Sequence, residues 1–450
     1  MKIALLGGGG VRTPLLIHGL TQAREQIGVS ELALYDVDRS RVELMAALGH
    51  EITRGTIAVT VAASLEQAID GATFVLSSLR VGGIAARAQD ERIAIAHGLV
   101  GQETTGPGGL AMALRTVPVA LEQARLIERY APDAYLINFT NPAGLITQAL
   151  RDHTKVRAIG ICDTPSELFH HIAEALGEFR NDLEFTYAGL NHLGWVSRIL
   201  LRGQDVMPRL LADEQLLLRL YPARLFEPAM IRTLGLIPSE YLFFLYARGI
   251  AFRNQQVSGA SRGAELQQMN NGLFERLRAG TPTEAVLLYK EYLNQRNASY
   301  MRLEAHGESA NQQDRRTVDP FDAATGYHRI AIDTMAALCG DSPASIVLNV
   351  RNHGAISDLA THDVVEVPCL VDRNGPRPLA TGTLPAAVRG VVLAVKEYER
   401  LAIRAAIEGS LSLAKLALLV YPIVGEWEPA STVLDALVAS DPKYLGYLRG

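Results

Sequence analysis

Two segments of the chain combine a thiol, a carboxyl group and an imidazole in a pattern that could hold a metal ion. The first is Gly160-Ile161-Cys162-Asp163, at the carboxyl end of an expected strand, where open α/β sheets bind ligands. The second is Gly189-Leu190-Asn191-His192, with the imidazole between glycine-bounded turns. A thiolate and an imidazole form half of a metal shell that substrate oxygens and water could complete. Taken singly, a cysteine is more often buried packing and a histidine more often a hydrogen-bonded structural residue.

Two further polar segments could line a sugar site. Asn138-Phe139-Thr140-Asn141-Pro142 closes another expected strand with two amides, which could bind sugar hydroxyls or cap a helix that begins near Pro142. Leu99 to Gly109 (LVGQETTGPGG) is a glycine-rich loop that carries Gln102 and Glu103. Because this loop is too polar to serve packing alone, we expect it to form a wall of the site.

The elements that must position these groups begin with a strand and a run of glycines. Ile3 to Leu6 is expected to be a buried parallel strand, followed by a turn of Gly7, Gly8, Gly9 and Gly10. Without Cβ atoms, this turn lets backbone N–H groups approach a pyrophosphate, toward which a helix over Pro14 to Gln26 would direct its positive end. The third glycine of the dinucleotide motif is replaced by Arg12 or Thr13, so a plain strand-to-helix turn is the alternative.

A second expected strand, Glu31 to Tyr35, leads into Asp36. A carboxylate at this position binds the ribose hydroxyls of NAD and disfavours the 2′-phosphate of NADP. Further strands are expected at Ala72 to Leu79, Ala134 to Phe139 and Arg157 to Ile161, in alternation with helical stretches. We therefore predict an α/β fold: a Rossmann-like, doubly wound parallel sheet in an NAD-binding domain over residues 1–165, then a mixed α+β, largely helical domain over residues 166–450.

The elements expected beyond residue 165 are less regular. The sequence predicts amphipathic helices at Arg202 to Tyr221 and Gly263 to Arg278, an exposed or mobile polar loop over residues 296–326, a strand at Asp363 to Val371, and mainly helical structure from Pro385 to Tyr447. The apolar stretch Leu411 to Val424 contains Lys415 and is broken by Pro422. It therefore predicts a packed helix and no membrane span.

The composition limits the class of protein. A chain of 450 residues with 48% hydrophobic and 20% charged residues is typical of a globular protein with two domains, or one domain and a large lobe. The net charge of −5 argues against nucleic acid as the main partner. Cys162, Cys339 and Cys369 form no evident disulfide framework, and the N-terminus has no signal-peptide pattern. We therefore expect a cytoplasmic protein with no membrane role.

Several motifs, taken in order, resemble those of the NAD- and manganese-dependent glycoside hydrolases of family four. The resemblance spans nearly the whole chain and is greatest to the 6-phospho-β-glucosidases. The motifs are the glycine turn with Thr13-Pro14, Tyr35 to Asp38, Val100 to Gly106, Asn138 to Pro142, the Cys162 segment, Gly189 to His192, Pro238 to Leu242, Leu348 to Ile356 and Val365 to Cys369. This family departs from the usual glycoside hydrolysis by two carboxyl groups.

The resemblance implies hydrolysis of a 6-phospho-glucoside through oxidation and elimination. NAD takes a hydride from C3 of the sugar, which makes the C2 proton acidic, and a base removes that proton. Mn²⁺, held by Cys162, His192 and sugar oxygens, stabilises the negative charge that results. The aglycone then leaves from C1, water adds, and NADH returns the hydride. Since thiolate and imidazole are softer ligands than manganese usually prefers, we expect other divalent metals to substitute.

The resemblance also implies roles for individual residues. Tyr241 is the expected base at C2, and Asp163, beside the expected metal cysteine, is counted with it as catalytic. A nearby cation would lower the pKa of the phenol. Arg262 is expected to bind the 6-phosphate, for which a guanidinium is well shaped. The expected substrate contacts are Arg87, Asn141 and Asn191, and Asn138 is an expected cofactor contact.

Two features leave the substrate open. Asp163 follows the expected metal cysteine as in α-specific members, whereas the remaining motifs favour the β-specific subgroup. Val11-Arg12 follows the glycines where many phospho-glucosidases carry Ser-Tyr or similar. The alternatives are a 6-phospho-α-glucosidase or another family-four glycosidase of the α-galactosidase or glucuronidase type, an NAD-dependent 2-hydroxyacid dehydrogenase, and a non-catalytic NAD sensor. The expected partners are a phosphorylated disaccharide or glucoside and further copies of the chain, in a homodimer or homotetramer.

Overall fold

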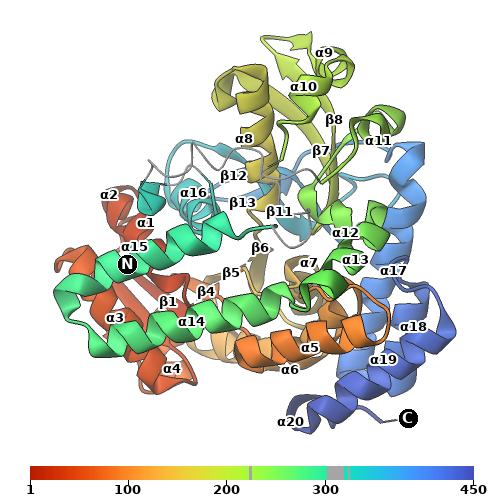
Figure 1. The fold of residues 1–450 in the computed structure, drawn as a ribbon. Coiled ribbons are helices and arrows are strands. Elements are labelled where there is room, and N and C mark those ends of the chain that lie inside the picture. The colour runs from red at the N-terminus through yellow and green to blue at the C-terminus, as the bar shows by residue number, and fades with distance from the viewer. Residues whose placement is uncertain (222–224, 302–318, 323–324, 450) are drawn as a thin grey trace.

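A sheet of 13 strands runs through the molecule (Figure 1). This computed structural model describes residues 1–221, 225–301, 319–322 and 325–449. The strand order is β10-β8-β7-β12-β11-β6-β5-β4-β1-β2-β3, with β13 beside β12 and β9 beside β8. A parallel half of the sheet thus continues directly into an antiparallel half.

The parallel half of the sheet comes from the first part of the chain. Its strands are β1 (Lys2–Leu6), β2 (Glu31–Tyr35), β3 (Ala58–Val61), β4 (Phe74–Ser77), β5 (Tyr135–Asn138) and β6 (Arg157–Gly160). Their order, 3-2-1-4-5-6, is that of a dinucleotide-binding Rossmann fold. Leu6 pairs with both Tyr35 and Ser77, so the carboxyl ends of β1, β2 and β4 meet at one edge. The strands expected in this region are confirmed, and β3 is an additional one.

Helices of the first part of the chain pack in two groups around this sheet. They are α1 (Thr13–Gln22), α2 (Arg24–Ile27), α3 (Arg39–Thr53), α4 (Leu65–Ile69), α5 (Gly83–Ala96), α6 (Gly106–Tyr130), α7 (Ala143–His153) and α8 (Thr164–Leu176). Helices α1 and α3 contact each other, and α6 contacts both α4 and α7, as in a doubly wound fold. The single helix expected over residues 14–26 is wrong, because Ala23 has φ −93° and ψ 13° and separates α1 from α2.

The antiparallel half of the sheet joins the parallel half at β6. Its strands are β7 (Leu183–Leu190), β8 (Leu193–Leu201), β9 (Gln204–Asp205), β10 (Ile237–Pro238), β11 (Ala344–Arg351), β12 (Val364–Asp372) and β13 (Gly375–Pro378). At the junction Gly160 pairs with Asn349. A Cβ at Gly160 would lie 2.4 Å from Oγ1 of Thr147, so β6 can approach its neighbours this closely only with glycine. The strand expected at residues 363–371 is confirmed as β12.

The later helices lie around the antiparallel half and in front of the parallel half (Figure 1). They are α9 (Met207–Ala212), α10 (Glu214–Leu217), α11 (Pro228–Leu234), α12 (Phe243–Tyr246), α13 (Arg248–Ser258), α14 (Arg262–Ala279), α15 (Pro282–Ala298), α16 (Tyr327–Cys339), α17 (Ala386–Glu408), α18 (Leu411–Val420), α19 (Trp427–Ser440) and α20 (Pro442–Leu445). The helix expected at 263–278 and the helical C-terminal part are confirmed. The apolar stretch from Leu411 is confirmed as a helix, which ends before Pro422.

For the middle of the chain, one expected helix is wrong and one expected loop lies mostly outside the described residues. The helix expected over residues 202–221 is wrong, because Arg202 and Gly203 adopt positive φ angles of 50° and 82° and turn the chain from β8 into β9. Only the short helices α9 and α10 follow. Of the polar loop expected over residues 296–326, residues 302–318 and 323–324 lie outside the described residues.

One hydrophobic core extends under both halves of the sheet. It includes Leu5 of β1, Leu348 of β11 and Leu434 of α19. A smaller cluster, with Met45 and Phe274, packs α3 against α14 and α15. Within the described residues, no helix combines the length and the apolar character that a membrane crossing needs. Because the sheet and the core cross residue 165, the division into two domains there stays a prediction.

Candidate active site

A row of paired residues across the middle of the sheet determines where the site forms. The register joins Asn138 to Gly160, Gly160 to Asn349, Asn349 to Glu366 and Glu366 to Gly189. Gly160 of this row is the last residue of β6, and Cys162 follows two residues later. Gly189 of the same row is near the end of β7, and His192 lies in the turn that follows. Strand pairing therefore brings together two segments that are distant in the sequence.

The glycine turn after β1 is shaped for close approach to the backbone. Gly7 has φ +87°, and a Cβ there would lie 2.3 Å from the backbone oxygen of Ser78. A Cβ at Gly9 would lie 3.0 Å from the carboxyl group of Asp36, which accepts a hydrogen bond from the N–H of Gly9 at 2.9 Å. The turn and Asp36 thus form a cradle that any larger side chain would fill. This geometry fits the pyrophosphate and ribose of a dinucleotide.

Cys162 and Asp163 follow β6 directly. Cys162 is 2% exposed, and burial, together with the charges of Glu366 and Asp163, raises the pKa of its thiol well above the usual value. Burial also raises the pKa of Asp163, against the opposing charge of Arg12. Positive charge brought to this strand end would therefore favour the thiolate that metal binding requires.

His192 lies in the turn between β7 and β8, with a left-handed φ of +62°. Its Nδ1 is 2.9 Å from the hydroxyl oxygen of Thr104. Its Nε2 is buried and has no hydrogen-bond partner within the described part of the chain. Burial lowers the pKa of His192 to about 4, so the imidazole is neutral at pH 7. A neutral ring with a buried, unpaired nitrogen is the form that a metal ligand takes.

Cys162 and His192 fit a metal that the protein holds through few ligands. Among the described residues, no group of three or more His, Cys, Asp or Glu side chains is placed to hold a metal ion. A thiolate and an imidazole then leave coordination positions open to oxygen atoms of a substrate or of water. The roles of Cys162 and His192 as metal ligands stay predictions.

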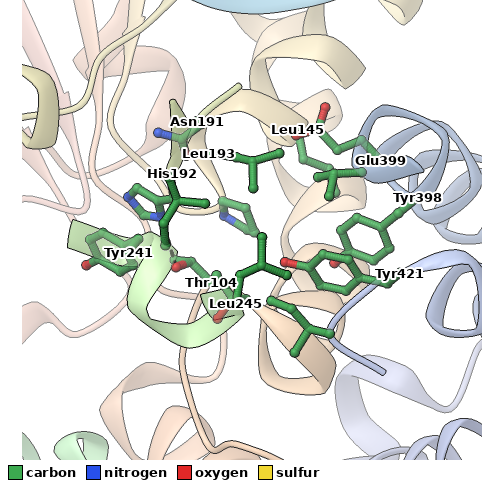
Figure 2. A pocket seen from close by; sticks show the side chains of 15 residues that line it. Thr104, Leu145, Asn191, His192, Leu193, Tyr241, Leu245, Tyr398, Glu399 and Tyr421 are labelled. Carbon is green, nitrogen blue, oxygen red and sulfur yellow. Dashed lines mark hydrogen bonds between the residues drawn. The ribbon is translucent and has the colours of Figure 1, made fainter. Parts of the chain in front are cut away.

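Tyr241 stacks on the imidazole of His192 (Figure 2), with ring centroids 3.8 Å apart and the ring planes 2° from parallel. It lies in the turn of residues 240–242 that connects β10 to α12. Burial and the charges of Glu103 and Glu240 raise the pKa of its phenol well above the usual value. Beside the two stacked rings is a cavity of about 30 Å³, also lined by Thr104. The structure thus places the expected base against the expected metal ligand.

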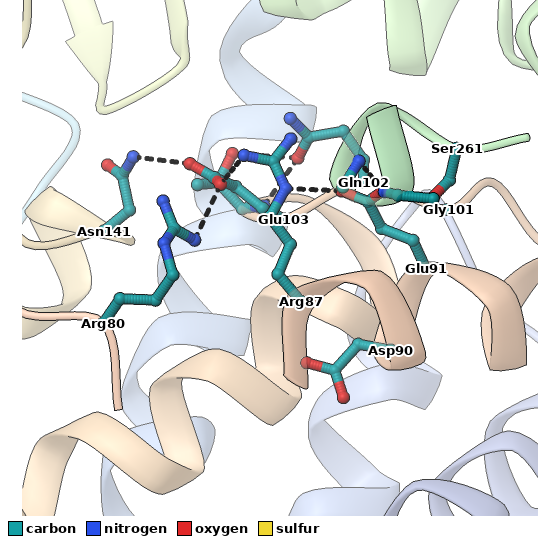
Figure 3. A network of polar contacts seen from close by, with 12 residues as sticks. Arg80, Arg87, Asp90, Glu91, Gly101, Gln102, Glu103, Asn141 and Ser261 are labelled. Atoms are coloured by element: carbon teal, nitrogen blue, oxygen red, sulfur yellow. Dashed lines mark hydrogen bonds and ion pairs between the residues drawn. The ribbon is translucent and has the colours of Figure 1, made fainter. Parts of the chain in front are cut away.

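Glu103 connects the residues expected to bind the sugar (Figure 3). Its carboxylate accepts hydrogen bonds from Arg80 at 2.9 Å, from Asn141 at 3.1 Å and from Arg87. Arg87 also donates to Glu91 at 2.8 Å. Although burial favours the neutral acid, Arg80 and Arg87 hold the pKa of Glu103 well below its usual range. Arg87 and Asn141 are therefore held together by a shared carboxylate.

Two other expected amides are hydrogen-bonded within the chain. Asn191 donates to Glu366 at 3.1 Å. Asn138 is fully buried; it donates to Thr147 at 3.2 Å and accepts from the N–H of Thr140 at 3.2 Å. The bonds of Asn138 stabilise the turn between β5 and α7. The contacts of Asn138 with the cofactor and of Asn191 with the substrate stay predictions.

Arg262 begins α14, and its guanidinium is bound by side-chain and backbone groups nearby. It donates to Oγ of Ser299 at 2.6 Å and to the backbone oxygen of Arg296 at 3.1 Å, and it pairs with Glu265 at 2.5 Å. Burial lowers the pKa of Arg296, and the like charges of Arg12 and Arg262 lower it further. Three arginines therefore concentrate positive charge at this end of the site.

Four residues that shape the site had no individual role predicted from the sequence. Glu103 and Thr104 lie in the glycine-rich loop already expected to form a wall, so the polarity of that loop was the available signal. Arg12 stands where the third glycine of the motif was missing, and it lies over the ring of Tyr327 at 4.1 Å. Glu366 is a carboxylate within the apolar run VVEVPCLV of β12, a pattern that indicates a buried partner.

The chain matches the sequence profiles of two consecutive parts of one enzyme family. The profile described as Family 4 glycosyl hydrolase matches residues 2–178, and the Family 4 glycosyl hydrolase C-terminal domain matches residues 187–424.

Curated relatives and a solved structure match over nearly their full length. A 6-phospho-beta-glucosidase from Escherichia coli is 30% identical, covering 99% of this chain and 96% of that protein. A phospho-alpha-glucosidase from Clostridium acetobutylicum is 27% identical, covering 100% and 99%. The structure of a Thermotoga maritima 6-phospho-beta glucosidase with manganese, NAD⁺ and glucose-6-phosphate is 28% identical, with a TM-score of 0.84 and 99% of each chain covered.

Proposed function

This chain belongs to family 4 of the glycosyl hydrolases, and we propose that it hydrolyses 6-phospho-glucosides, preferably the β anomer, with NAD and a divalent metal as cofactors. The observation that carries the proposal is the stack of Tyr241 on His192, whose Nε2 is buried without a partner among the described residues. This stack places the Tyr241 phenol beside a nitrogen that is available to a metal. Glycoside hydrolysis by two carboxyl groups would need neither a phenol base nor a metal ligand.

Two parts of the chain hold the proposed cofactors. The turn of residues 7–10 offers backbone N–H groups to the pyrophosphate of NAD, and Asp36 offers its carboxylate to the ribose hydroxyls. Cys162 and His192 are the proposed ligands of the metal, manganese by analogy with the solved relative. When bound, NAD accepts a hydride from C3 of the sugar and the metal acts as a Lewis acid.

Tyr241 is the proposed base that takes the proton from C2 of the sugar. In the protein alone, burial and the carboxylates of Glu103 and Glu240 oppose formation of the phenolate. The phenol therefore becomes a base only where positive charge lies close to it, and the stack on His192 holds it at that place. Asp163 is the second proposed catalytic residue, because it follows Cys162 at the same strand end.

Arg87, Asn141 and Asn191 are the proposed contacts with the sugar. Arg87 and Asn141 approach from the Glu103 side, and Asn191 lies in the same turn as His192. Glu91 accepts hydrogen bonds both from Arg87 at 2.8 Å and from the N–H of residue 263 at 2.6 Å. The sugar end of the site is therefore joined to the start of α14.

Arg262, the first residue of α14, is the proposed ligand of the 6-phosphate. Its present partners include the carboxylate of Glu265. A phosphate group would compete with this carboxylate for the guanidinium of Arg262. The charges of Arg12 and Arg296 add to the positive potential there, which attracts a dianionic group. A phosphate on C6 would then fix which end of the sugar meets Tyr241.

A panel of 4-nitrophenyl glucosides tests the proposal. The α and β glucosides, each with and without a 6-phosphate, are incubated with protein that has been dialysed against a chelator. We expect cleavage of the 6-phosphorylated β-glucoside only after both NAD and Mn²⁺ are added. Cleavage without either cofactor would contradict the proposal.

The same panel decides the second candidate, a 6-phospho-α-glucosidase. Asp163 favours that candidate, as does the relative with a phospho-alpha-glucosidase name. Faster cleavage of the phosphorylated α-glucoside would assign it. Release of NADH from a 2-hydroxy acid, with no glucoside cleaved, would indicate a dehydrogenase instead.

We further propose a cytoplasmic homodimer or homotetramer. The free state of Cys162, Cys339 and Cys369 supports a reducing compartment. Light scattering of the purified protein would give the mass of the assembly, and a mass of one chain would contradict the oligomer.

A further inference from the structure

We propose that Gln102 and Thr104 hold His192 in the tautomer that carries its proton on Nδ1, which leaves Nε2 as the metal-binding atom. Both are positioning residues, because they act on the metal site only through the imidazole. The inference rests on the proposed role of His192 as a metal ligand. It adds the residues that prepare this ligand before any metal arrives.

The orientation of the Gln102 amide is determined by the backbone. The N–H groups of Thr104 and Thr105 point at the same side-chain atom, Oε1, at 2.6 Å and 2.9 Å. A backbone N–H only donates, so the atom that both approach must be the oxygen and not the amide nitrogen. Gln102 therefore presents an acceptor to its surroundings at this point.

The hydroxyl of Thr104 has two neighbours and one proton. Its oxygen is 2.9 Å from Oε1 of Gln102 and 2.9 Å from Nδ1 of His192. Because Oε1 can only accept, the hydroxyl proton goes to Gln102, and the Thr104 oxygen must accept at its other contact. Nδ1 of His192 is then the donor.

The proton on Nδ1 leaves the lone pair of the neutral ring on Nε2. Nε2 is the nitrogen that is buried and has no partner among the described residues. Gln102, Thr104 and His192 are 7%, 6% and 5% exposed, so water has little access to replace these contacts. A protein group bonded to the second nitrogen is the usual way in which a metal-binding histidine is oriented.

The loop that carries Gln102 and Thr104 is itself anchored on two helices. Gln255 of α13 accepts from the N–H of Gly101 at 3.0 Å and donates to its backbone oxygen at 2.7 Å. A Cβ at Gly101 would lie 2.5 Å from the backbone oxygen of Glu91 in α5. The distance between Thr104 and His192 is thus held by packed elements on the loop side.

Nitrogen NMR of the metal-free protein tests the tautomer directly. The full chain is labelled with ¹⁵N-histidine, and two-bond ¹H–¹⁵N correlations at mildly alkaline pH show which ring nitrogen carries the proton. His192→Gln identifies the signals of His192 by their loss. We expect the proton on Nδ1 in the wild type, and a proton on Nε2 would overturn the inference without any need for a variant.

Three variants test the role of the Thr104 hydroxyl. Thr104→Val keeps the shape and removes the acceptor, so we expect a mixture of tautomers. Thr104→Ser restores the hydroxyl and should restore the single tautomer. Thr105→Val is the matched control, because it keeps the backbone N–H that orients Gln102 and removes only a hydroxyl 3.3 Å from Oε1. A single Nδ1–H tautomer in Thr104→Val would overturn the role of Thr104.

Binding of Mn²⁺ alone, followed by electron paramagnetic resonance of the free ion, provides the second measurement. We expect Thr104→Val to weaken binding roughly 10- to 100-fold, with Thr104→Ser and Thr105→Val close to wild type. Equal affinity of Thr104→Val and wild type would overturn the inference. A wild-type protein that binds no Mn²⁺ even with NAD and glucose 6-phosphate present would overturn the proposed function, and the tautomer measured without metal would still decide the present inference.

Discussion

At the Glu103 carboxylate, Arg80, Arg87 and Asn141 converge in a buried part of the molecule. Removing one partner of a buried charge pair leaves the other charge without compensation. We expect Glu103→Gln to lower the free energy of unfolding by about 3–5 kcal/mol, toward the lower value since Arg87 keeps its bond to Glu91. Urea denaturation of both proteins at pH 7 measures this change.

The exposed pair of Arg276 and Glu291, at 2.6 Å, provides the control. Glu291→Gln should change the free energy of unfolding by at most about 1 kcal/mol. The pH dependence has a definite sign, because the pKa of Glu103 in the folded protein lies below its unfolded value. Its stabilisation is present above about pH 4.3 and is lost as the pH falls toward the folded pKa. Equal effects of the two substitutions would contradict the central role of Glu103.

Tyr241 is the residue whose chemistry separates the proposed mechanism from its alternatives. Tyr241→Phe removes the phenol oxygen but keeps a ring that can stack on His192. We therefore expect turnover to fall by roughly 10²- to 10⁴-fold with little change in Mn²⁺ affinity. Steady-state kinetics and a metal titration measure the two quantities. A matching loss of metal affinity would mean that Tyr241 supports the metal site and is not the base.

Exchange with solvent gives an independent test of proton removal at C2. Hydrolysis by the wild type in D₂O should place deuterium at C2 of the released sugar, which mass spectrometry and NMR detect. Product without deuterium would contradict elimination, unless the proton is shielded from solvent and returned. A substrate deuterated at C2 removes that ambiguity, because a slower reaction and loss of the label would still report the proton transfer.

The candidate site residues that can be predicted from residue types and spacing stand at strand ends, whereas those that depend on tertiary contacts cannot be predicted in this way. Cys162, His192 and Asp36 were visible because glycine turns and strand ends mark them. The partners of Glu103 come from two separate segments, one with Arg80 and Arg87 and one with Asn141, and no spacing in the sequence shows that they meet at one carboxylate. The stack of Tyr241 on His192 was hidden for the same reason, since Tyr241 lies in a stretch of aromatic residues typical of packing.

At the scale of elements, helices α1 and α16 meet at a pair of histidines. A Cβ at Gly19 of α1 would lie 3.6 Å from the ring of His328 in α16. Burial lowers the pKa of His328 to about 4, and nearby Arg329, His18 and Arg12 act in the same direction. Burial also lowers the pKa of His18, against the charge of Asp322. At low pH, protonation of His18 and of His328 would therefore place positive charge on both helices at this contact.

The stability of the protein should depend on pH through His328. Its folded pKa of about 4 lies below the unfolded value of about 6.5, so the unfolded chain binds more protons between these values. The free energy of unfolding should fall as the pH drops from about 6.5 to 4, by up to about 3 kcal/mol for this group. Denaturation of His328→Gln across this range should show a smaller loss than the wild type, whereas the exposed control His50→Gln should follow the wild type.

The elements found from the sequence are those with a strong local pattern. The strands at 31–35 and 157–160 are apolar and bounded by turns, and α14 has a serine cap and a regular apolar spacing. Strand β3 has only four residues, two of them exposed, so its pattern is too weak to find. The segment 202–221 repeats apolar residues at helical spacing, but the turn at Arg202 and Gly203 takes its first residues into a hairpin.

At the scale of the whole molecule, the two halves share a sheet and a core. The pairing of Gly160 with Asn349 links the parallel half to the antiparallel half, and α17 contacts both α6 and β7. The profile matches divide the chain near residue 180, within the region that the continuous sheet spans. Because the two halves share a sheet and a core, we expect them to unfold together, so that a ligand bound to one half also raises the free energy of unfolding of the other.

NAD should therefore stabilise the half of the molecule that does not bind it. Trp427 is 60% exposed and Trp195, on β8, is 2% exposed, so Trp427→Phe leaves one tryptophan, buried in the antiparallel half. NAD at a hundred times its dissociation constant raises the free energy of unfolding by about 2.7 kcal/mol. We expect the free energy of unfolding, measured by urea denaturation with Trp195 fluorescence, to rise by this full amount with NAD. NADP at the same concentration should raise it less, because Asp36 disfavours a 2′-phosphate. An unmoved Trp195 transition would show that the halves unfold independently and would support the domain division predicted at residue 165.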